Sequence, residues 1–349
     1  SNSSAASDVY KRQEREEFTF SPVNFGVVLH AVIREVCDEI KKNGESYYLI
    51  SEEKRREMVK RSVAAITDIY QNSILKDSSR NSFMIKRMED LADRTVWAMG
   101  EQLKCGDFVP FVFEHKFNME VGDGDRKQLM SGTIDRVDIC ENGTDVYVRI
   151  IDYKTGKKDF NIVKTYYGID IQLMVYMEAA MKLVAKMRPG KNVIPAGVFY
   201  YNISDPIVSA TTESAEEIED KIKGELRLKG MVNSDKDIAE KMDNTEGTSL
   251  NIPVSRKADG GFDSRRSKVM NTEQFNILGR FVDVRAIDTA DRIAGGDIRR
   301  SPYKDGQFSS CDRCPYGAVC GFSVDLPGCN YRTVSYTHLR AHETGRNLV

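Results

Sequence analysis

The sequence of 349 residues lacks several features that would place it in a broad class of protein. No apolar run approaches the roughly 18 residues of a membrane-spanning helix. The first residues lack the basic and then apolar segments of a secretory signal peptide, and no internal repeat is evident. With 40% hydrophobic and 30% charged residues, the composition is typical of a soluble globular protein.

Neither sign of charge dominates, because 51 basic residues face 53 acidic ones and the formal net charge is −2. A dedicated duplex-binding domain usually carries a basic excess, so any binding of nucleic acid must depend on a local site. The sequence also lacks a phosphate-binding loop of the G-x-x-x-x-G-K-[ST] type. We therefore expect no ATP hydrolysis by this chain.

The seven cysteines do not form the framework of a small, disulfide-bonded secreted domain. Four of them fall within 19 positions, from Cys311 to Cys329, and the first three follow the spacing C-x2-C-x5-C. Thiolates at this density bind zinc or an iron–sulfur cluster. The other three are expected to be ordinary buried thiols.

The two ends of the chain, residues 1–13 and 334–349, carry no convincing apolar periodicity. They resemble translated adapter sequence, with natural disordered tails as the alternative. We expect the native folded unit to be residues 14–333, taken from a longer protein.

Hydrophobic periodicity predicts an order of helices, three strands, a helix and a strand. The expected elements are helices at residues 24–41, 51–74 and 82–104, strands at 108–117, 128–139 and 145–153, a helix at about 169–187 and a strand at 193–202. Asn24 is the expected N-cap of the first helix, and turn signals at 122–124 and 142–143 make the three strands an antiparallel meander. This order predicts an α/β fold with a mixed sheet flanked by helices.

Residues 204–300 are expected to be an α-rich insertion followed by a return helix. The polar part, 204–270, contains an expected helix at 214–228 and little continuous core, and a long helix is expected at 272–293. Residues 301–333 would then form the cysteine loop.

The strongest chemical signal lies in two neighbouring strands, in the motifs G-T-I-D-R-V-D at 132–138 and I-I-D-Y-K-T-G at 150–156. Asp152 and Lys154 leave the same face of a strand, and a hairpin can place Asp135 opposite them. Paired carboxylates bind Mg²⁺, and a lysine beside the metal can position the attacking water. The pattern suits phosphodiester hydrolysis.

A surface hairpin with salt bridges is the alternative interpretation of these two motifs. The apolar residues beside the charged ones argue against it, because unpaired buried charge is costly.

Together with Q-L-M-V-Y at 172–176, these motifs resemble the PD-(D/E)xK nuclease superfamily in its RecB-like branch. The resemblance is closer to the C-terminal nuclease domains of the AddB family, the B subunits of helicase–nucleases, and covers nearly all of residues 14–333. It implies a restriction-endonuclease-like core and a Mg²⁺- or Mn²⁺-dependent exonuclease. The substrate would be single-stranded DNA fed by an AddA-like helicase subunit during double-strand-break repair and recombination. A bacterial cytoplasmic location, with no membrane partner, is also implied.

The resemblance assigns roles to individual positions. The metal ligands that it implies are His30, Asp135, Asp152 and the carbonyl of Tyr153. Lys154 matches the catalytic lysine, and Glu114 matches an acidic position that holds a metal-bound water or a second ion. Gln172 and Tyr176, one helical turn apart, would help to position the substrate strand.

For the cysteine loop the resemblance implies a [4Fe–4S] cluster held by Cys311, Cys314 and Cys320. In the family a cysteine upstream of the nuclease core supplies the remaining ligand, and that position would lie before residue 14. Cys329 is the alternative fourth ligand, and a structural zinc bound by all four cysteines is the alternative to a cluster.

Two other functions stay open from the sequence. One is a stand-alone RecB-like or Cas4-like iron–sulfur nuclease, against which the long insertion at 204–300 argues. The other is a non-catalytic domain stapled by a metal, against which the joint presence of Asp135, Asp152 and Lys154 argues. No residue indicates the polarity of digestion.

Overall fold

The computed structural model describes residues 22–71, 79–121, 127–209, 213–312 and 314–334. Residues 1–13, all but the first residue of 334–349, and the turn expected at 122–124 lie outside the described residues. The other expected turn is present, since Gly143 has a φ of 60° between two paired strands.

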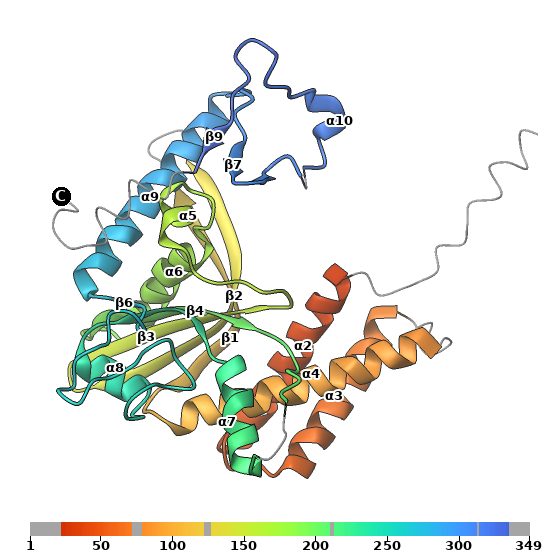
Figure 1. The fold of residues 1–349 in the computed structure, drawn as a ribbon, viewed down its shortest axis with the longest axis vertical. Coiled ribbons are helices and arrows are strands. Elements are labelled where there is room, and N and C mark those ends of the chain that lie inside the picture. Colours follow the sequence, from red (N-terminus) through yellow and green to blue (C-terminus); the bar gives the residue numbers. More distant parts are fainter. Residues whose placement is uncertain (1–21, 72–78, 122–126, 210–212, 313, 335–349) are drawn as a thin grey trace, which may run out of the picture.

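A six-stranded mixed sheet forms the centre of the molecule (Figure 1), with the strand order β1-β2-β3-β4-β5-β6. The strands are β1 (Val109–Val121), β2 (Gln128–Asn142), β3 (Asp145–Lys154), β4 (Asn192–Asn202), β5 (Lys229–Asn233) and β6 (Val269–Met270). The first three form an antiparallel meander, β4 lies parallel to β3, β5 is antiparallel to β4, and β6 is parallel to β5. The predicted α/β fold with a mixed sheet is confirmed.

Helices cover both faces of this sheet (Figure 1). One layer contains α2 (Pro22–Lys42), α3 (Glu52–Gln71) and α4 (Ser79–Lys104), and the other contains α6 (Gln172–Met187) and α9 (Thr272–Ala294). Because both faces are covered, eight consecutive residues of β3 are buried. The shorter helices are α5 (Ile162–Tyr166), α7 (Ala215–Glu225) and α8 (Lys236–Met242).

The first helix begins earlier than expected. It starts at Pro22, and Asn24 lies inside it, so the prediction of Asn24 as the N-cap is wrong. Proline suits the first helical turn, because its φ is already helical and its missing N–H has no partner there. None of the described helices is both long and apolar enough to cross a membrane.

Residues 204–270 contain more core than the sequence indicated. They add β5 and β6 to the sheet, and their buried apolar side chains include Leu226, Leu228, Val232, Ile238, Met242, Ile252 and Val254. The buried carboxylate of Asp243 accepts hydrogen bonds from Ser249 (2.8 Å) and Asn251 (3.1 Å). The expectation of little core is therefore wrong, because these apolar residues stand singly or in pairs between polar ones and give no long periodic run.

A cluster of three buried charges joins β2 to β3. The guanidinium of Arg136 donates two hydrogen bonds to the carboxylate of Asp138, at 2.7 and 2.6 Å. From β3, Arg149 donates a third at 2.9 Å and stacks over the ring of Phe108 at 4.8 Å. Each of the three charged side chains is at most 1% exposed. Burial raises the pKa of Asp138, but the two cations outweigh that effect and lower it.

Replacing Asp138 with asparagine should leave two buried cations without a counter-charge. We expect Asp138→Asn to lower the free energy of unfolding by about 3–5 kcal/mol, measured by chemical denaturation. The matched control is Asp107→Asn, because Asp107 is 65% exposed and lies 3.4 Å from Lys241. It should cost less than about 1 kcal/mol. Equal losses in the two variants would contradict a stabilising role for the buried cluster.

Candidate metal centre and active site

Three carboxylates lie in a row across three neighbouring strands. The register of β1 with β2 places Glu114 opposite Asp135. The register of β2 with β3, continued by one residue, places Asp135 opposite Asp152. Side chains opposite one another in an antiparallel pair are close neighbours. The meander therefore brings together three acidic residues that are far apart in the sequence.

His30 reaches this row from α2, on the helical layer that packs against the sheet. Its Nδ1 lies 3.5 Å from Oδ1 of Asp135 and 3.6 Å from Oε1 of Glu114. The ligand atoms of these three residues all lie within 4.8 Å of one another. One imidazole and two carboxylates form a donor set that suits a divalent cation such as Mg²⁺ or Mn²⁺.

The backbone of β3 orients this group. The amide of Tyr153 donates a hydrogen bond to Oδ2 of Asp135 at 2.6 Å, and the Tyr153 ring meets the His30 ring edge-on at a centroid distance of 5.9 Å. Since Oδ2 is engaged by the amide, Oδ1 is the oxygen that points toward His30. The carbonyl of Tyr153 as a metal ligand stays a prediction.

Glu114 has the only positive φ among the described non-glycine residues, at 46°. This left-handed conformation costs an ordinary L-residue about 1–2 kcal/mol. The strain coincides with the position where the Glu114 carboxylate meets His30 and Asp135.

Asp152 and Lys154 form the other half of the site. Their carboxylate and ammonium groups lie 2.5 Å apart. From α6, the amide nitrogen of Gln172 donates to Asp152 at 3.2 Å and to the hydroxyl of Tyr176 at 2.9 Å. Gln172 and Tyr176 thus share one face of α6, as their helical spacing predicted, and Gln172 ties α6 to the acidic row. Their role in positioning a substrate strand stays a prediction.

The ionisation of two residues reports the local electrostatics. Burial lowers the pKa of His30, but its contacts with Asp135 and Glu114 outweigh that effect and raise the pKa to about 10. Burial and the neighbouring charge of Asp135 raise the pKa of Asp152 to about 6, against the opposing effect of Lys154. Both shifts indicate concentrated negative charge, which a divalent cation would neutralise.

Sequence reasoning missed the support behind Lys154. The ring of Tyr200, on β4, lies 5.7 Å from Nζ of Lys154 and 4.9 Å from Nζ of Lys158. The Tyr200 hydroxyl donates to Asp170 at 2.8 Å, and Lys158 pairs with Asp170 at 3.1 Å. Tyr200 is fully buried. The only signal in the sequence was an aromatic residue in a strand, which is common in cores.

The cysteine loop is a separate small unit. It contains α10 (Gly317–Cys320) and a three-stranded sheet of β7 (Tyr303–Asp305), β8 (Phe308–Ser309) and β9 (Arg332–Thr333). Cys311 and Cys320 are half-buried, Cys314 is exposed and Cys329 is buried. Within the described part of the chain, no three cysteine sulfurs lie within 4.8 Å of one another. The geometry does not assemble a cluster site, and the iron–sulfur cluster stays a prediction.

Comparison of the sequence with known families finds a match to one of them. The model of the PD-(D/E)XK nuclease superfamily matches residues 6–321. The chain belongs to the PD-(D/E)XK nuclease superfamily. The acidic and lysine positions of the pattern in that name are present here as Asp135 and Asp152-Tyr-Lys154, with Ile134 where the name has proline.

Curated relatives of this superfamily member share one name, which describes the B subunit of an ATP-dependent helicase/deoxyribonuclease. The chain is 34% identical over 335 residues to that of Caldanaerobacter subterraneus subsp. tengcongensis, covering 93% of the chain and 29% of the relative. Those of Clostridium acetobutylicum and Clostridium botulinum strain Hall are 33% and 32% identical, covering 92% of the chain and 28% and 29% of each relative. The chain spans less than a third of these relatives. The resemblance drawn from the motifs is confirmed.

Tyr200 should act on cleavage through the position of Lys154. We expect Tyr200→Leu to lower kcat about tenfold with little change in KM, because a cation–π contact at a half-buried lysine is lost. Tyr200→Phe keeps the ring and should recover most of the rate. Tyr201→Leu is the matched control, since Tyr201 is also buried but contacts Tyr153 rather than Lys154. A similar kcat for the two leucine variants, measured well below both melting temperatures, would contradict this positioning role.

Proposed function

We propose that this chain is the metal-dependent nuclease domain of a helicase–nuclease subunit and that it hydrolyses phosphodiester bonds of single-stranded DNA. The observation that supports the proposal most is the cluster of His30, Glu114 and Asp135 beside the Asp152–Lys154 pair. It unites a hard-cation donor set with a half-buried lysine in a chain of the nuclease superfamily. We further propose that the products carry a 5′-phosphate and a 3′-hydroxyl.

The residues fit a divalent cation. His30 Nδ1, the Glu114 carboxylate and Oδ1 of Asp135 would hold it, with Asp152 as a further carboxylate at the same position in the sheet. When bound, Mg²⁺ or Mn²⁺ would polarise the scissile phosphate and lower the pKa of a water ligand. Among the described residues, no second group of this kind gathers His, Cys, Asp or Glu ligands.

The chain's own groups then orient the reaction. Lys154, held by Asp152 at 2.5 Å and by the Tyr200 ring, would direct the attacking water and stabilise negative charge that develops on the phosphate. Gln172 restrains Asp152, and Tyr176 beside it would line the path of the substrate strand. These side chains would thus contribute by positioning the water and the substrate and by stabilising charge, on the rigid support of the sheet.

The larger assembly is part of the proposal. The relatives are named as B subunits of an ATP-dependent helicase/deoxyribonuclease, which supports an AddA-type partner, a supply of unwound single strands, and a role in repair and recombination. The same names favour this assembly over a stand-alone nuclease. We propose that digestion is exonucleolytic and that the chain acts in the bacterial cytoplasm.

Replacing either half of the Asp152–Lys154 pair should remove the activity. We expect Asp152→Asn and Lys154→Ala each to slow Mg²⁺-dependent degradation of labelled single-stranded DNA at least about a hundredfold. EDTA should abolish the parent activity, and added Mn²⁺ should restore it. Asp145→Asn, at the opposite end of β3, is the control and should leave the rate unchanged. Degradation by Asp152→Asn at the parent rate would contradict the proposal.

We also propose that Cys311, Cys314 and Cys320 hold a [4Fe–4S] cluster. The support for this proposal is their C-x2-C-x5-C spacing in the sequence. The loop has little apolar packing of its own, since Tyr316 is 71% and Val319 is 88% exposed. A metal cross-link would supply stability that burial does not.

Anaerobic reconstitution with iron and sulfide tests this assignment. The parent chain should retain iron and acid-labile sulfide, and Cys314→Ser should lose them. Cys105→Ser, which alters a cysteine outside the loop, should behave as the parent. Retention of zinc without iron in the parent, or equal iron in all three proteins, would contradict a cluster.

A further inference from the structure

A large cleft begins next to the candidate active site. It has a volume of about 1260 Å³ and is lined mainly by α4, by residues 155–159 after β3 and by residues 202–205 at the end of β4. Ligand pockets for small molecules rarely exceed about 1,000 Å³, so this space suits a segment of a polymer. Its charge and shape identify which polymer.

The cleft is continuous with the end of β3 that carries Lys154. Thr155 and Gly156 follow that lysine directly, and Asn202 pairs with Lys154 in register. Asn202 also exchanges two hydrogen bonds with the backbone of Lys158, at 2.9 and 3.0 Å. These bonds hold the wall of the cleft rigidly against the sheet. A strand lying in the cleft would therefore pass the end of β3 that carries Lys154.

One face of α4 presents a cation, an aromatic ring and a second cation along the cleft. Arg80, Phe83 and Arg87 are spaced at i, i+3 and i+7, and all three are exposed, Phe83 by 64%. Lys157 faces them from the loop after β3 and is also exposed. An exposed phenylalanine between arginines is a platform on which an unpaired base can stack while its phosphates meet the cations.

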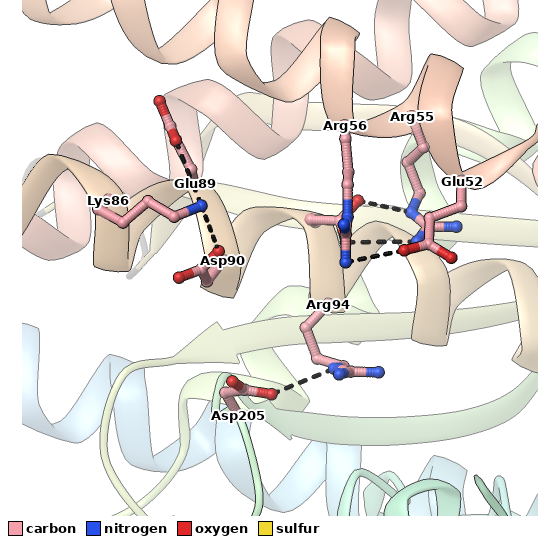
Figure 2. Close-up of polar contacts among 9 residues, drawn as sticks. Glu52, Arg55, Arg56, Lys86, Glu89, Asp90, Arg94 and Asp205 are labelled. Carbon is pink, nitrogen blue, oxygen red and sulfur yellow. Dashed lines mark hydrogen bonds and ion pairs between the residues drawn. The ribbon is translucent and has the colours of Figure 1, made fainter. Parts of the chain in front are cut away.

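Three of the four acidic residues that line the cleft already pair with other cations, and the fourth, Glu225, lies at the end of α7. Asp90 pairs with Lys86 at 2.8 Å and Asp205 pairs with Arg94 at 3.2 Å (Figure 2). Asp159 pairs with Lys268 at 2.5 Å. In contrast, no ion pair engages the three cations Arg80, Arg87 and Lys157 within the described residues, and they are left to bind an external anion.

We propose that this cleft binds the single-stranded DNA on one side of the scissile phosphate. Arg80, Arg87 and Lys157 contact phosphates, and Phe83 stacks on a base. The inference rests on the proposed nuclease function and adds to it a path by which the strand is held. It also explains how a chain of net charge −2 can bind a polyanion, since three exposed cations gather along this one cleft.

The test measures DNA affinity apart from cleavage. Binding of fluorescein-labelled oligo-dT is followed by anisotropy in EDTA at several salt concentrations. The triple variant Arg80→Ala, Arg87→Ala, Lys157→Ala should bind more weakly, and its slope of log affinity against log salt should fall by about 2, because each phosphate contact contributes about 0.7. Phe83→Ala should weaken binding about tenfold with an unchanged slope.

Matched controls remove equal charge and equal aromatic surface elsewhere. The triple variant Lys60→Ala, Lys104→Ala, Lys186→Ala alters three exposed lysines outside the cleft, and Phe308→Ala removes a phenylalanine that is 76% exposed on the cysteine loop. Both should bind like the parent. If the parent cleaves DNA but each cleft variant binds like its control, the cleft assignment is wrong and the nuclease function stands. If the parent binds oligo-dT through these residues but does not cleave it with Mg²⁺, the nuclease function is wrong and the binding cleft stands.

Discussion

The buried contact of Asp138 with two arginines is the interaction on which the site depends. It joins β2 to β3 inside the core, three residues from Asp135. A one-residue slip between these strands would turn every side chain to the other face, and here it would also separate Arg149 on β3 from the carboxylate of Asp138 on β2. The charge cluster therefore fixes the register that places Asp135 opposite Asp152, and it links the stability of the core to the geometry of the acidic row.

Around that row the protein holds its charges in two different ways. The carboxylates of Glu114 and Asp135 face one imidazole, which leaves an excess of negative charge. Lys154, by contrast, is supported from one side by Asp152 and from the other by a buried tyrosine ring. An anionic metal pocket and a cationic lysine thus lie on adjacent strands, the arrangement needed to bind a metal ion and a phosphate together.

Much of this could be predicted from the sequence, because local patterns carry it. The helices and the meander follow from periodicity and turn signals. The grouping of His30, Glu114 and Asp135 was implied by the family resemblance of the motifs. The buried Arg149, the Tyr200 support and the strand β5 could not be predicted in the same way. Each depends on contacts between segments distant in sequence, and a single arginine, tyrosine or short polar strand has no periodic pattern. In the cysteine loop the spacing of the cysteines in the sequence suggests a metal site. The packing of the described part of the loop does not bring three of their sulfurs together.

The backbone at Glu114 shows what the site demands of the fold. At a φ of 46°, glycine would be the most stable choice, yet the position carries the one side chain that completes the group around His30. The residue best for folding and the residue best for chemistry are different here. A protein engineered only for thermal resistance would drift toward glycine at this position and lose its acidic ligand, an instance of the trade-off between stability and activity at catalytic sites.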